Sequence, residues 1–433
     1  MTTLFGVCTA AFFFMSMVIL LKIWKVRKRD DDNPLPGGSM GWPFIGETLE
    51  FVSCAYSSRP ESFMDKRRLI YGKVFKSHIF GSPTVVSTDP EVSKFVLQSD
   101  ARTFVPSYPR SLMELMGKSS ILLINGSLQR RVHGLIGSFL KSPHLKSQIT
   151  QDMHKYVDDL MGSWEDDQLV YVQDETKQIS FQLLVRGLMS LEPGEDMQFL
   201  KQQFRIFIAG LMSLPARKRM VKLIRGIIKE RRKKADIVGS GFAPRDVLDV
   251  LLGDNYSDQL TDELISDNMI DLMIPGEDSV PLLMTLAVKY LSDCPTALKQ
   301  LEVITETLRL GNIIYGTMRK AMRDVEVKGY LIPKGWCVLT YFRSVHLDET
   351  HYADPYGFSP WRWQGKDSST TCNFTPFGGG QRLCPGLDLA RLEASVFLHH
   401  LVTRFTWVAE EDTIVNFPTV RMKGRMPVRV RRK

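Results

Sequence analysis

The sequence predicts a mainly α-helical protein with a small β portion, built as one extended domain behind an N-terminal transmembrane anchor. Three observations predict this class. The chain opens with an uncharged, mostly apolar run of 18 residues, Leu4 to Leu21. A β-rich stretch around Gly81-Ser82-Pro83 predicts one hairpin at 74–88. Helical periodicity accounts for most of the rest, over 91–99, 128–140, 146–164, 175–190, 195–214, 216–234, 262–292 and 387–403.

Residues 1–29 are predicted to be a transmembrane signal anchor with a basic stop. At 1.5 Å per residue, the apolar run from Leu4 to Leu21 is just long enough to span a bilayer. Five cations between Lys22 and Arg29 follow it, which predicts that everything after Arg29 stays in the cytosol. The alternative is a cleaved signal peptide, which prefers a basic start and a shorter apolar centre.

Residues 30–46 are predicted to be a linker rich in proline and glycine. Pro34, Pro36 and Pro43 stand among four glycines, which disfavours both a helix and a central strand. We therefore expect a stiff spacer that fixes the orientation of the following domain relative to the anchor. That domain is predicted to span residues 47–433.

Charge and cysteine content exclude several classes of protein. The 433 residues carry a net charge of +8, but twelve cations lie in two clusters, 22–29 and 421–433, and the remainder has a net charge of −4. Nucleic acid is therefore not expected as a partner. The first cluster is either a solvated end or a contact with an anionic membrane surface. Six scattered cysteines form no zinc pattern and no disulfide framework.

The centre of the helical pattern at 262–292 contains residues that disfavour a helix, in the stretch IDLMIPGEDSVPLLMTLAV. Pro275 and Pro281 each remove a backbone donor, and Gly276 removes a side chain, which together cost several kcal/mol of helix propensity. Three polar residues at 277–279 stand at this point among apolar neighbours. The stretch is either a helix break with a solvated turn or an opening that serves chemistry.

Two short motifs are weak when taken alone. Glu306 and Arg309, in ETLR, are neighbours on one face of a helix, as in many surface pairs. Arg362 lies in FSPWRW. A third motif is stronger because FGGGQRLCPG, residues 377–386, fixes a phenylalanine, two glycines, an arginine and one cysteine within ten positions.

In this order the motifs resemble those of the cytochrome P450 family of haem-thiolate monooxygenases. The resemblance implies the cytochrome P450 fold, haem b as cofactor, and Cys384 as the axial thiolate ligand of the iron. It also implies that Arg382 faces a haem propionate and that Phe377 shields the sulfur. Gly380 and Gly386 would let the backbone approach the porphyrin and leave amides free to point at the sulfur.

The same resemblance implies roles on both sides of the haem. Glu306, Arg309 and Arg362 would form a buried ionic triad that positions the cysteine loop. Asp278 and Ser279 would lie in the oxygen-binding groove and relay protons. The family usually has threonine at the second of these positions, and serine keeps the hydroxyl group without the stiffening methyl group.

The distal contact to a propionate departs from the family pattern. The family often has Trp-x-x-x-Arg on an early helix, where this chain has Gln129 and His133. His133, with Arg130 nearby, either donates a hydrogen bond to a propionate or is an ordinary histidine on a helix surface.

Longer stretches, such as NMIDLMIPGEDSVP, resemble plant cytochromes P450 of brassinosteroid biosynthesis that hydroxylate a sterol side chain at C-23. This implies an endoplasmic-reticulum membrane enzyme, single-pass with a cytosolic catalytic domain. It also implies electrons from NADPH through NADPH–cytochrome reductase, and a sterol precursor as substrate. Another sterol position, at C-22 or by oxidation at C-3 or C-6, is the alternative.

Two joints are shorter than the resemblance leads us to expect. Only Pro215 separates two helical patterns, where a longer substrate lid is expected. Ser279 and Glu306 are only 27 positions apart, so a helix and its loop near 301 are missing. The chain is therefore either an active enzyme, because the motifs near the iron are intact, or a catalytically impaired variant.

Overall fold

The structure is a computed structural model and describes residues 34–433 except 109–112, 115, 210–213, 239–242, 255–258, 300–301, 367–371 and 418. The predicted anchor at 1–29 and the first residues of the linker lie outside these described residues. None of the helices that the described residues form has the length and apolar content needed to cross a membrane.

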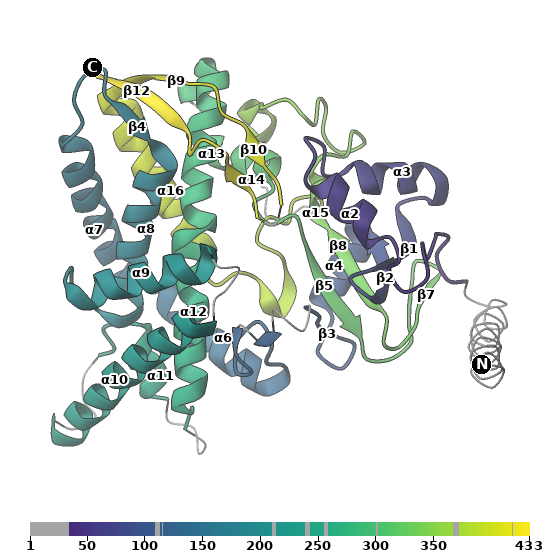
Figure 1. The fold of residues 1–433 in the computed structure, drawn as a ribbon, viewed down its shortest axis with the longest axis horizontal. Helices are drawn as coiled ribbons and strands as arrows, with labels where there is room; N and C mark the ends of the chain where they lie inside the picture. Colours follow the sequence, from purple (N-terminus) through teal and green to yellow (C-terminus); the bar gives the residue numbers. More distant parts are fainter. Residues whose placement is uncertain are drawn as a thin grey trace, which may run out of the picture.

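A larger helical part and a smaller part built on a sheet lie side by side (Figure 1). The helical part consists of α6 Gly126–Leu140, α7 Pro143–Gly162, α8 Val172–Met189, α9 Glu195–Ala209, α10 Leu214–Val238, α11 Val247–Leu252, α12 Asp262–Glu277, α13 Ser279–Asp293 and α16 Leu387–Arg404. The sheet part carries α2 Thr48–Ala55, α3 Ser62–Tyr71, α4 Pro90–Gln98 and α15 Phe342–His346. Between the parts, α14 Val303–Gly311 contacts elements of both. The prediction of a mainly helical chain with a small β portion is confirmed.

The main sheet has five strands in the order β1-β2-β8-β5-β3. These are β1 Val74–Ile79, β2 Ser82–Ser87, β3 Phe104–Pro106, β5 Gly316–Ala321 and β8 Cys337–Tyr341. β2 pairs with β8 in parallel, and the other neighbours are antiparallel. The predicted hairpin at 74–88 is therefore completed by strands from the C-terminal half.

Three smaller sheets complete the β portion. They are β4 Leu169–Tyr171 with β12 Pro427–Arg432 and β9 Phe405–Ala409, β6 Val325–Val327 with β7 Tyr330–Ile332, and β10 Ile414–Val415 with β11 Arg421–Met422. The first of these lies against the helical part, where β9 contacts α13 and α16.

The sequence of α7 explains why this segment is a helix. Ser142 accepts a hydrogen bond from the Leu145 amide, and Pro143 fills the first position, where no amide hydrogen is needed. An apolar residue then recurs at every fourth position and is buried: Leu145, Ile149, Met153, Val157 and Met161. Because each such burial stabilises the fold by about 1.5–3 kcal/mol, α7 packs firmly against α8 and α16.

The single helix predicted over 262–292 is in fact two helices, α12 and α13, which meet at Asp278. Asp278 has φ −118° and ψ −66°, and its amide still donates to the Ile274 carbonyl at 3.1 Å. Gly276 lies against α8, since a Cβ there would come 2.8 Å from Leu184 Cδ2. The prolines thus weaken the helix without changing its course (Figure 1).

Both short joints are partly described. α9 ends at Ala209 and α10 begins at Leu214, so the boundary between these helices differs from the predicted ranges, and residues 210–213 lie outside the described residues. After α13 a 3-10 helix, η1 Pro295–Lys299, leads toward α14. A groove of about 700 Å³ lies beside this second joint, lined by the end of α13, η1 and β9.

Candidate active site

The cysteine loop connects the short 3-10 helix at Gly380–Arg382 to the start of α16. Gly380 has φ +64°, and a Cβ there would lie 2.2 Å from the Leu97 carbonyl oxygen. Only glycine therefore lets the loop pass α4 this closely. The Cys384 amide donates to the Phe377 carbonyl at 3.1 Å, which closes the loop.

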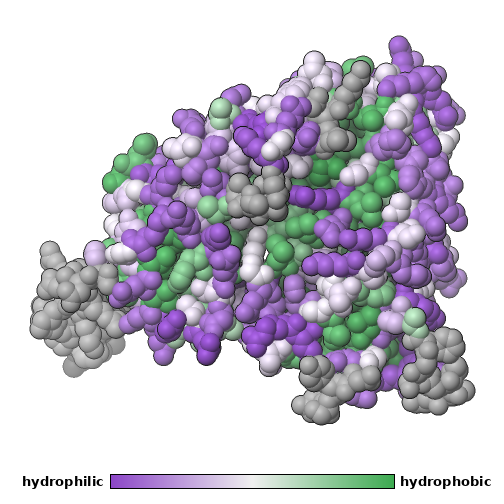
Figure 2. Space-filling view, turned by 180° about the vertical axis from the view of Figure 1, so that it is seen from behind, coloured by the Kyte–Doolittle hydropathy of each residue, from purple (hydrophilic) through white to green (hydrophobic). Residues whose placement is uncertain are grey.

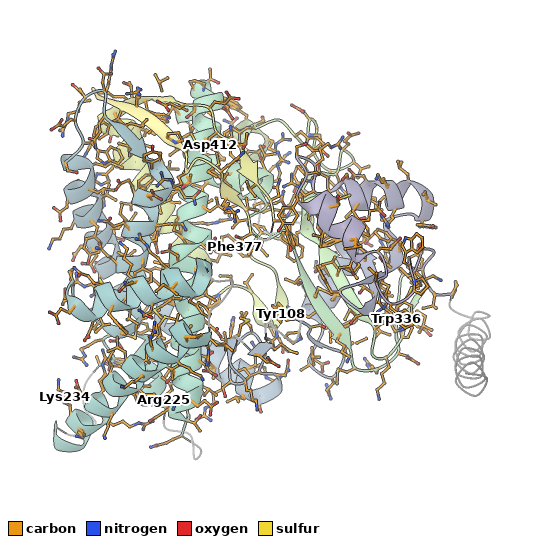
Figure 3. All side chains as sticks on the ribbon, in the orientation of Figure 1. Tyr108, Arg225, Lys234, Trp336, Phe377 and Asp412 are labelled. Atoms are coloured by element: carbon orange, nitrogen blue, oxygen red, sulfur yellow. The ribbon has the colours of Figure 1, made fainter. Side chains whose placement is uncertain are left out.

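The sulfur of Cys384 is half-buried at the N-terminal end of α16. Burial raises the pKa of the Cys384 thiol, and the Gly386 amide opposes this by donating toward the sulfur. The helix dipole favours negative charge at the same end. Phe377 packs against the helical core and lies at the centre of the molecule, between the two parts (Figure 3). The loop can therefore present a thiolate to a metal ion in a partly dry setting.

The cysteine loop is held from the side of α6. Arg382 donates to two carbonyl oxygens and the Asn125 side chain in the segment 121–125. Gln129 Nε2 donates to the Gln381 carbonyl at 3.1 Å. The loop is thus tied to α6 on both sides of Arg382.

His133 also faces the cysteine loop. Its Nε2 lies 2.7 Å from the Leu383 carbonyl oxygen. Because a carbonyl only accepts hydrogen bonds, Nε2 carries the proton. Arg130 is exposed. His133 thus contacts the residue that precedes Cys384 in the chain. Donation from His133 to a propionate stays a prediction.

Arg319 and Tyr108 belong to this region and were missed by the sequence reasoning. Arg319, on β5, is 8% exposed. Burial lowers the pKa of Arg319, and a hydrogen bond with Tyr108 opposes the change. Burial and the charge of Arg319 lower the pKa of Arg382 to about 10. Within the described part of the chain, neither guanidinium group pairs with a carboxylate, so the buried Arg319 and the half-buried Arg382 have no counter-charge there.

The burial of β5 in the structure identifies Arg319, which no pattern in the sequence did. The burial of β5 alternates at its end, with Arg319 and Ala321 inward and Lys320 exposed. An arginine on the inward side of a strand needs an anionic partner. Tyr108 has no pattern in the sequence either, because it lies in a loop.

Asp278 and Ser279 lie side by side at the junction of α12 and α13, and both are half-buried. Burial raises the pKa of Asp278, and the charge of Lys177 on α8 opposes this. Lys177 makes its ion pair with Glu277, with Nζ 3.3 Å from Oε1. An acid with a raised pKa therefore stands next to a hydroxyl group, as proton transfer requires.

The structure brings Glu306, Arg309 and Arg362 together. Glu306 accepts two hydrogen bonds from Arg309, at 2.7 and 2.9 Å, and one from Arg362 Nε at 3.0 Å. The Ser359 amide and the Trp363 indole also donate to this carboxylate. Glu306 and Arg309 are both 0% exposed, so the charges are compensated inside the protein.

A buried histidine, which the sequence did not indicate, connects this network to the cysteine loop. His346 lies with Nδ1 2.7 Å from Asn312 Oδ1, and its Nε2 accepts from the Thr375 amide. Burial lowers the pKa of His346 to about 3. The neutral ring therefore joins the end of α14 to the residues just before Phe377.

Comparison with known proteins gives a family and close relatives. The family model described as Cytochrome P450 matches residues 297–427. Cytochrome P450 90D2 from Oryza sativa subsp. japonica is 63% identical over an alignment of 443 positions, and the alignment covers 92% of this chain and 89% of the relative. The 3-epi-6-deoxocathasterone 23-monooxygenase CYP90D1 of Arabidopsis thaliana is 58% identical over 441 residues, with coverage of 92% and 89%.

A solved structure shares the fold. The retinoic acid bound cyanobacterial CYP120A1 has a TM-score of 0.79 and 22% sequence identity, and the match covers 93% of this chain and all of that one. The alignment with the Oryza relative also bears on chain length. It runs over 443 positions, whereas 92% of this 433-residue chain is about 398 residues, so about 45 positions of the relative face gaps here.

Proposed function

Because this chain belongs to the cytochrome P450 family, we propose that it is a haem-thiolate monooxygenase that hydroxylates a plant steroid side chain at C-23. The observation that carries the proposal is the position of the Cys384 sulfur, beside the Gly386 amide at the start of α16. The steroid and the carbon come from similarity to the Arabidopsis relative, whose name states both. Hydroxylation at C-22, or oxidation at C-3 or C-6, is the alternative within steroid chemistry.

Haem b is the cofactor of this family, and the residues of this chain fit it. Cys384 supplies a sulfur ligand with an amide donor directed at it. The half-buried Arg382 and the buried Arg319 supply two guanidinium groups without carboxylate partners among the described residues, which suits the two propionates. Gly380 lets the loop pass close to α4, which fixes the loop that carries the sulfur.

Other residues are assigned to the rim of the cofactor. His133 and Arg130 would face a propionate from α6, and the Tyr108 hydroxyl group would help Arg319 hold the other. Because His133 Nε2 already donates to the Leu383 carbonyl, donation to a propionate would need a second proton, on Nδ1. Tyr108 and Phe377 both lie between the helical part and the sheet part, which supports a site there (Figure 3).

Haem, when bound, supplies the iron at which oxygen is activated by electrons from NADPH. The protein does the remaining work. The Gly386 amide and the dipole of α16 stabilise the thiolate form of Cys384, and Phe377 keeps water from the sulfur. Ser279 and Asp278 would hold and pass on protons on the opposite side, where burial raises the pKa of Asp278 and so favours its protonated form.

A membrane location and a reductase partner are part of the proposal. Large apolar side chains near the start of the described chain are exposed, among them Trp42 at 79%, Phe44 at 83% and Leu69 at 89%. They follow the predicted anchor at 1–29 and would rest on the endoplasmic-reticulum surface. Hydrophobic areas are visible among hydrophilic ones on the sheet part, at the left of Figure 2. NADPH–cytochrome reductase would dock on the cytosolic side.

The short joints favour a second reading, in which the enzyme is catalytically impaired. About 45 positions of the Oryza relative have no counterpart here. The groove beside the second joint lies next to η1, which is the 3-10 helix described between α13 and α14. Less packing beneath the haem would weaken its binding.

The carbon monoxide difference spectrum of the reduced protein separates the two readings. Thiolate ligation gives the long-wavelength Soret band typical of the family, and we expect it for the full chain expressed with its anchor. Cys384→Ala should abolish the band, whereas Cys54→Ala, a cysteine outside the site, should retain it. A short-wavelength band in the unmodified chain would favour the impaired reading.

Turnover tests the substrate. Membranes containing the full chain and the reductase are incubated with 3-epi-6-deoxocathasterone and NADPH, and the product is analysed by mass spectrometry. A hydroxyl group at C-23 is the expected result. A normal spectrum without any hydroxylated steroid would refute the proposed activity while leaving the haem assignment intact.

A further inference from the structure

Asp271 is a buried acid on α12 that neither the fold nor the proposed chemistry uses. It is 7% exposed, and neither carboxyl oxygen has a hydrogen-bond partner among the described residues. The Ser120 hydroxyl and the Ile121 amide lie close enough to restrain the pKa, but the Ile121 amide donates to Asn268 Oδ1 at 2.8 Å. The carboxyl group is therefore enclosed and unsatisfied.

The neighbouring polar residues on α12 differ because each has a structural partner. Asp267 pairs with Arg217 of α10 and accepts from the Ser119 amide. Asn268 accepts from the Ile121 amide and donates to the Ser119 carbonyl. These contacts fasten the loop at 119–121 to α12. Asp271 lies one turn further along α12, and neither of its carboxyl oxygens has a partner in this docked loop.

Asp271 lies on the side of α12 that leads to the proposed reaction site. Asn268, Asp271, Pro275 and Ser279 follow at spacings of three and four, which line one side of a helix. Asp271 and Ser279 are eight positions apart, which is about 12 Å along the helix axis. Pro275 cannot donate to the main-chain carbonyl of Asp271 either, because it has no amide hydrogen. The unsatisfied acceptors therefore lie two turns from Ser279, on its side.

An isolated buried carboxyl group is costly. Leaving it without a hydrogen bond costs about 1–3 kcal/mol or more, so such a group in a binding site is often satisfied only by the ligand. Burial, together with the nearby charge of Asp267, raises the pKa of Asp271 to about 7. Near neutral pH the carboxyl group can therefore accept a hydrogen bond or donate one, as a hydroxyl partner requires.

We infer that Asp271 binds a hydroxyl group of the steroid substrate and so sets which end of the molecule reaches the reaction site. The inference rests on the proposed function, because it needs a steroid whose hydroxyl lies far from the carbon that reacts. The ring hydroxyl at C-3 meets this condition, since it lies at the opposite end of the molecule from the side chain.

The test compares two ligands on three proteins. Substrate-induced shifts of the Soret band give dissociation constants for 3-epi-6-deoxocathasterone and for its analogue without the C-3 hydroxyl. We expect the wild-type holoenzyme to bind the analogue at least about tenfold more weakly. Asp271→Leu should bind both ligands equally. Glu393→Gln is the matched control, since Glu393 is also buried with one unpartnered oxygen but faces Ser180, and it should keep the wild-type ratio.

Stability provides a second readout. A carboxyl group that serves binding opposes folding, so Asp271→Leu should raise the urea midpoint of the holoenzyme. Two results would overturn the inference and leave the proposed function standing. In one, Asp271→Leu keeps the wild-type ratio of the two dissociation constants. In the other, the wild type hydroxylates the steroid but binds both ligands equally. A wild type that binds neither steroid overturns both.

Discussion

The indole nitrogen of Trp363 donates a 2.8 Å hydrogen bond to Oε2 of Glu306, deep inside the protein. The same ring contacts Phe374, with centroids 4.7 Å apart, just before the cysteine loop begins. The carboxylate that neutralises Arg309 is thus coupled through one aromatic side chain to the segment that carries the sulfur. This coupling extends the triad that the sequence motifs indicated.

Glu306→Gln should be strongly destabilising. It leaves the fully buried Arg309 without its counter-charge, and breaking a buried pair in this way costs about 3–5 kcal/mol. Urea unfolding followed by circular dichroism measures the loss. Glu349→Gln, at an exposed position, should change the free energy of unfolding by less than about 0.5 kcal/mol. Equal effects of both variants would mean that the ion pair contributes nothing specific.

His346 should make the folded state sensitive to acid. Its pKa of about 3 when folded lies below the ordinary value of 6.5, so the unfolded state takes up a proton first as the pH falls. The contribution of His346 is complete above pH 6.5 and is lost progressively toward pH 3. Between pH 7.5 and 5.0 the wild type should lose about 2 kcal/mol more stability than His346→Gln. The exposed His351→Gln variant should behave as the wild type, and identical pH profiles for all three would contradict the assignment.

Gly276→Ala should destabilise the contact between α8 and α12. The new methyl group would come 2.8 Å from Leu184 Cδ2 and 3.2 Å from the Ser180 carbonyl oxygen, and such overpacking costs about 1–3 kcal/mol. Gly134→Ala on α6 meets no atom within 4 Å and should stabilise the protein by up to about 1 kcal/mol. The two variants should change the free energy of unfolding in urea with opposite signs. No change in Gly276→Ala would show that α8 moves to accommodate the methyl group.

Arg319→Met should loosen the cofactor. Loss of a charge-assisted hydrogen bond to a propionate is worth about 1.5–3 kcal/mol, so haem should pass to an acceptor apoprotein roughly 10 to 100 times faster. Arg323→Met is the control, because Arg323 lies just beyond the same strand and is exposed. An unchanged rate in Arg319→Met would remove this residue from the cofactor site.

The sequence predicts those features of the fold and the site that depend on residues close together in the chain. The start of α7 follows from Ser142 and Pro143, and its buried face follows from the four-residue spacing. Cys384 was found because its glycines and arginine lie within ten positions of it. The prolines marked the weak point of 262–292, although the exact junction at Asp278 depends on packing against α8.

The rest depends on contacts between distant segments. Arg319 points inward only because β5 pairs with β8 in a register that sets Arg319 opposite Val338. His346 receives its role from Asn312 on one side and Thr375 on the other. No local pattern reveals such partners, because they come from segments far apart in the sequence.

The order of strands in the main sheet has a consequence for biosynthesis. Val86 of β2 pairs with Leu339 of β8, and Phe104 of β3 pairs with Ala321 of β5. During translation the first hairpin must therefore wait with an open edge until most of the polypeptide has left the ribosome. An unpaired edge of this kind attracts other chains, so we expect yield in a foreign host to depend on slow synthesis and on chaperones that cover the nascent hairpin.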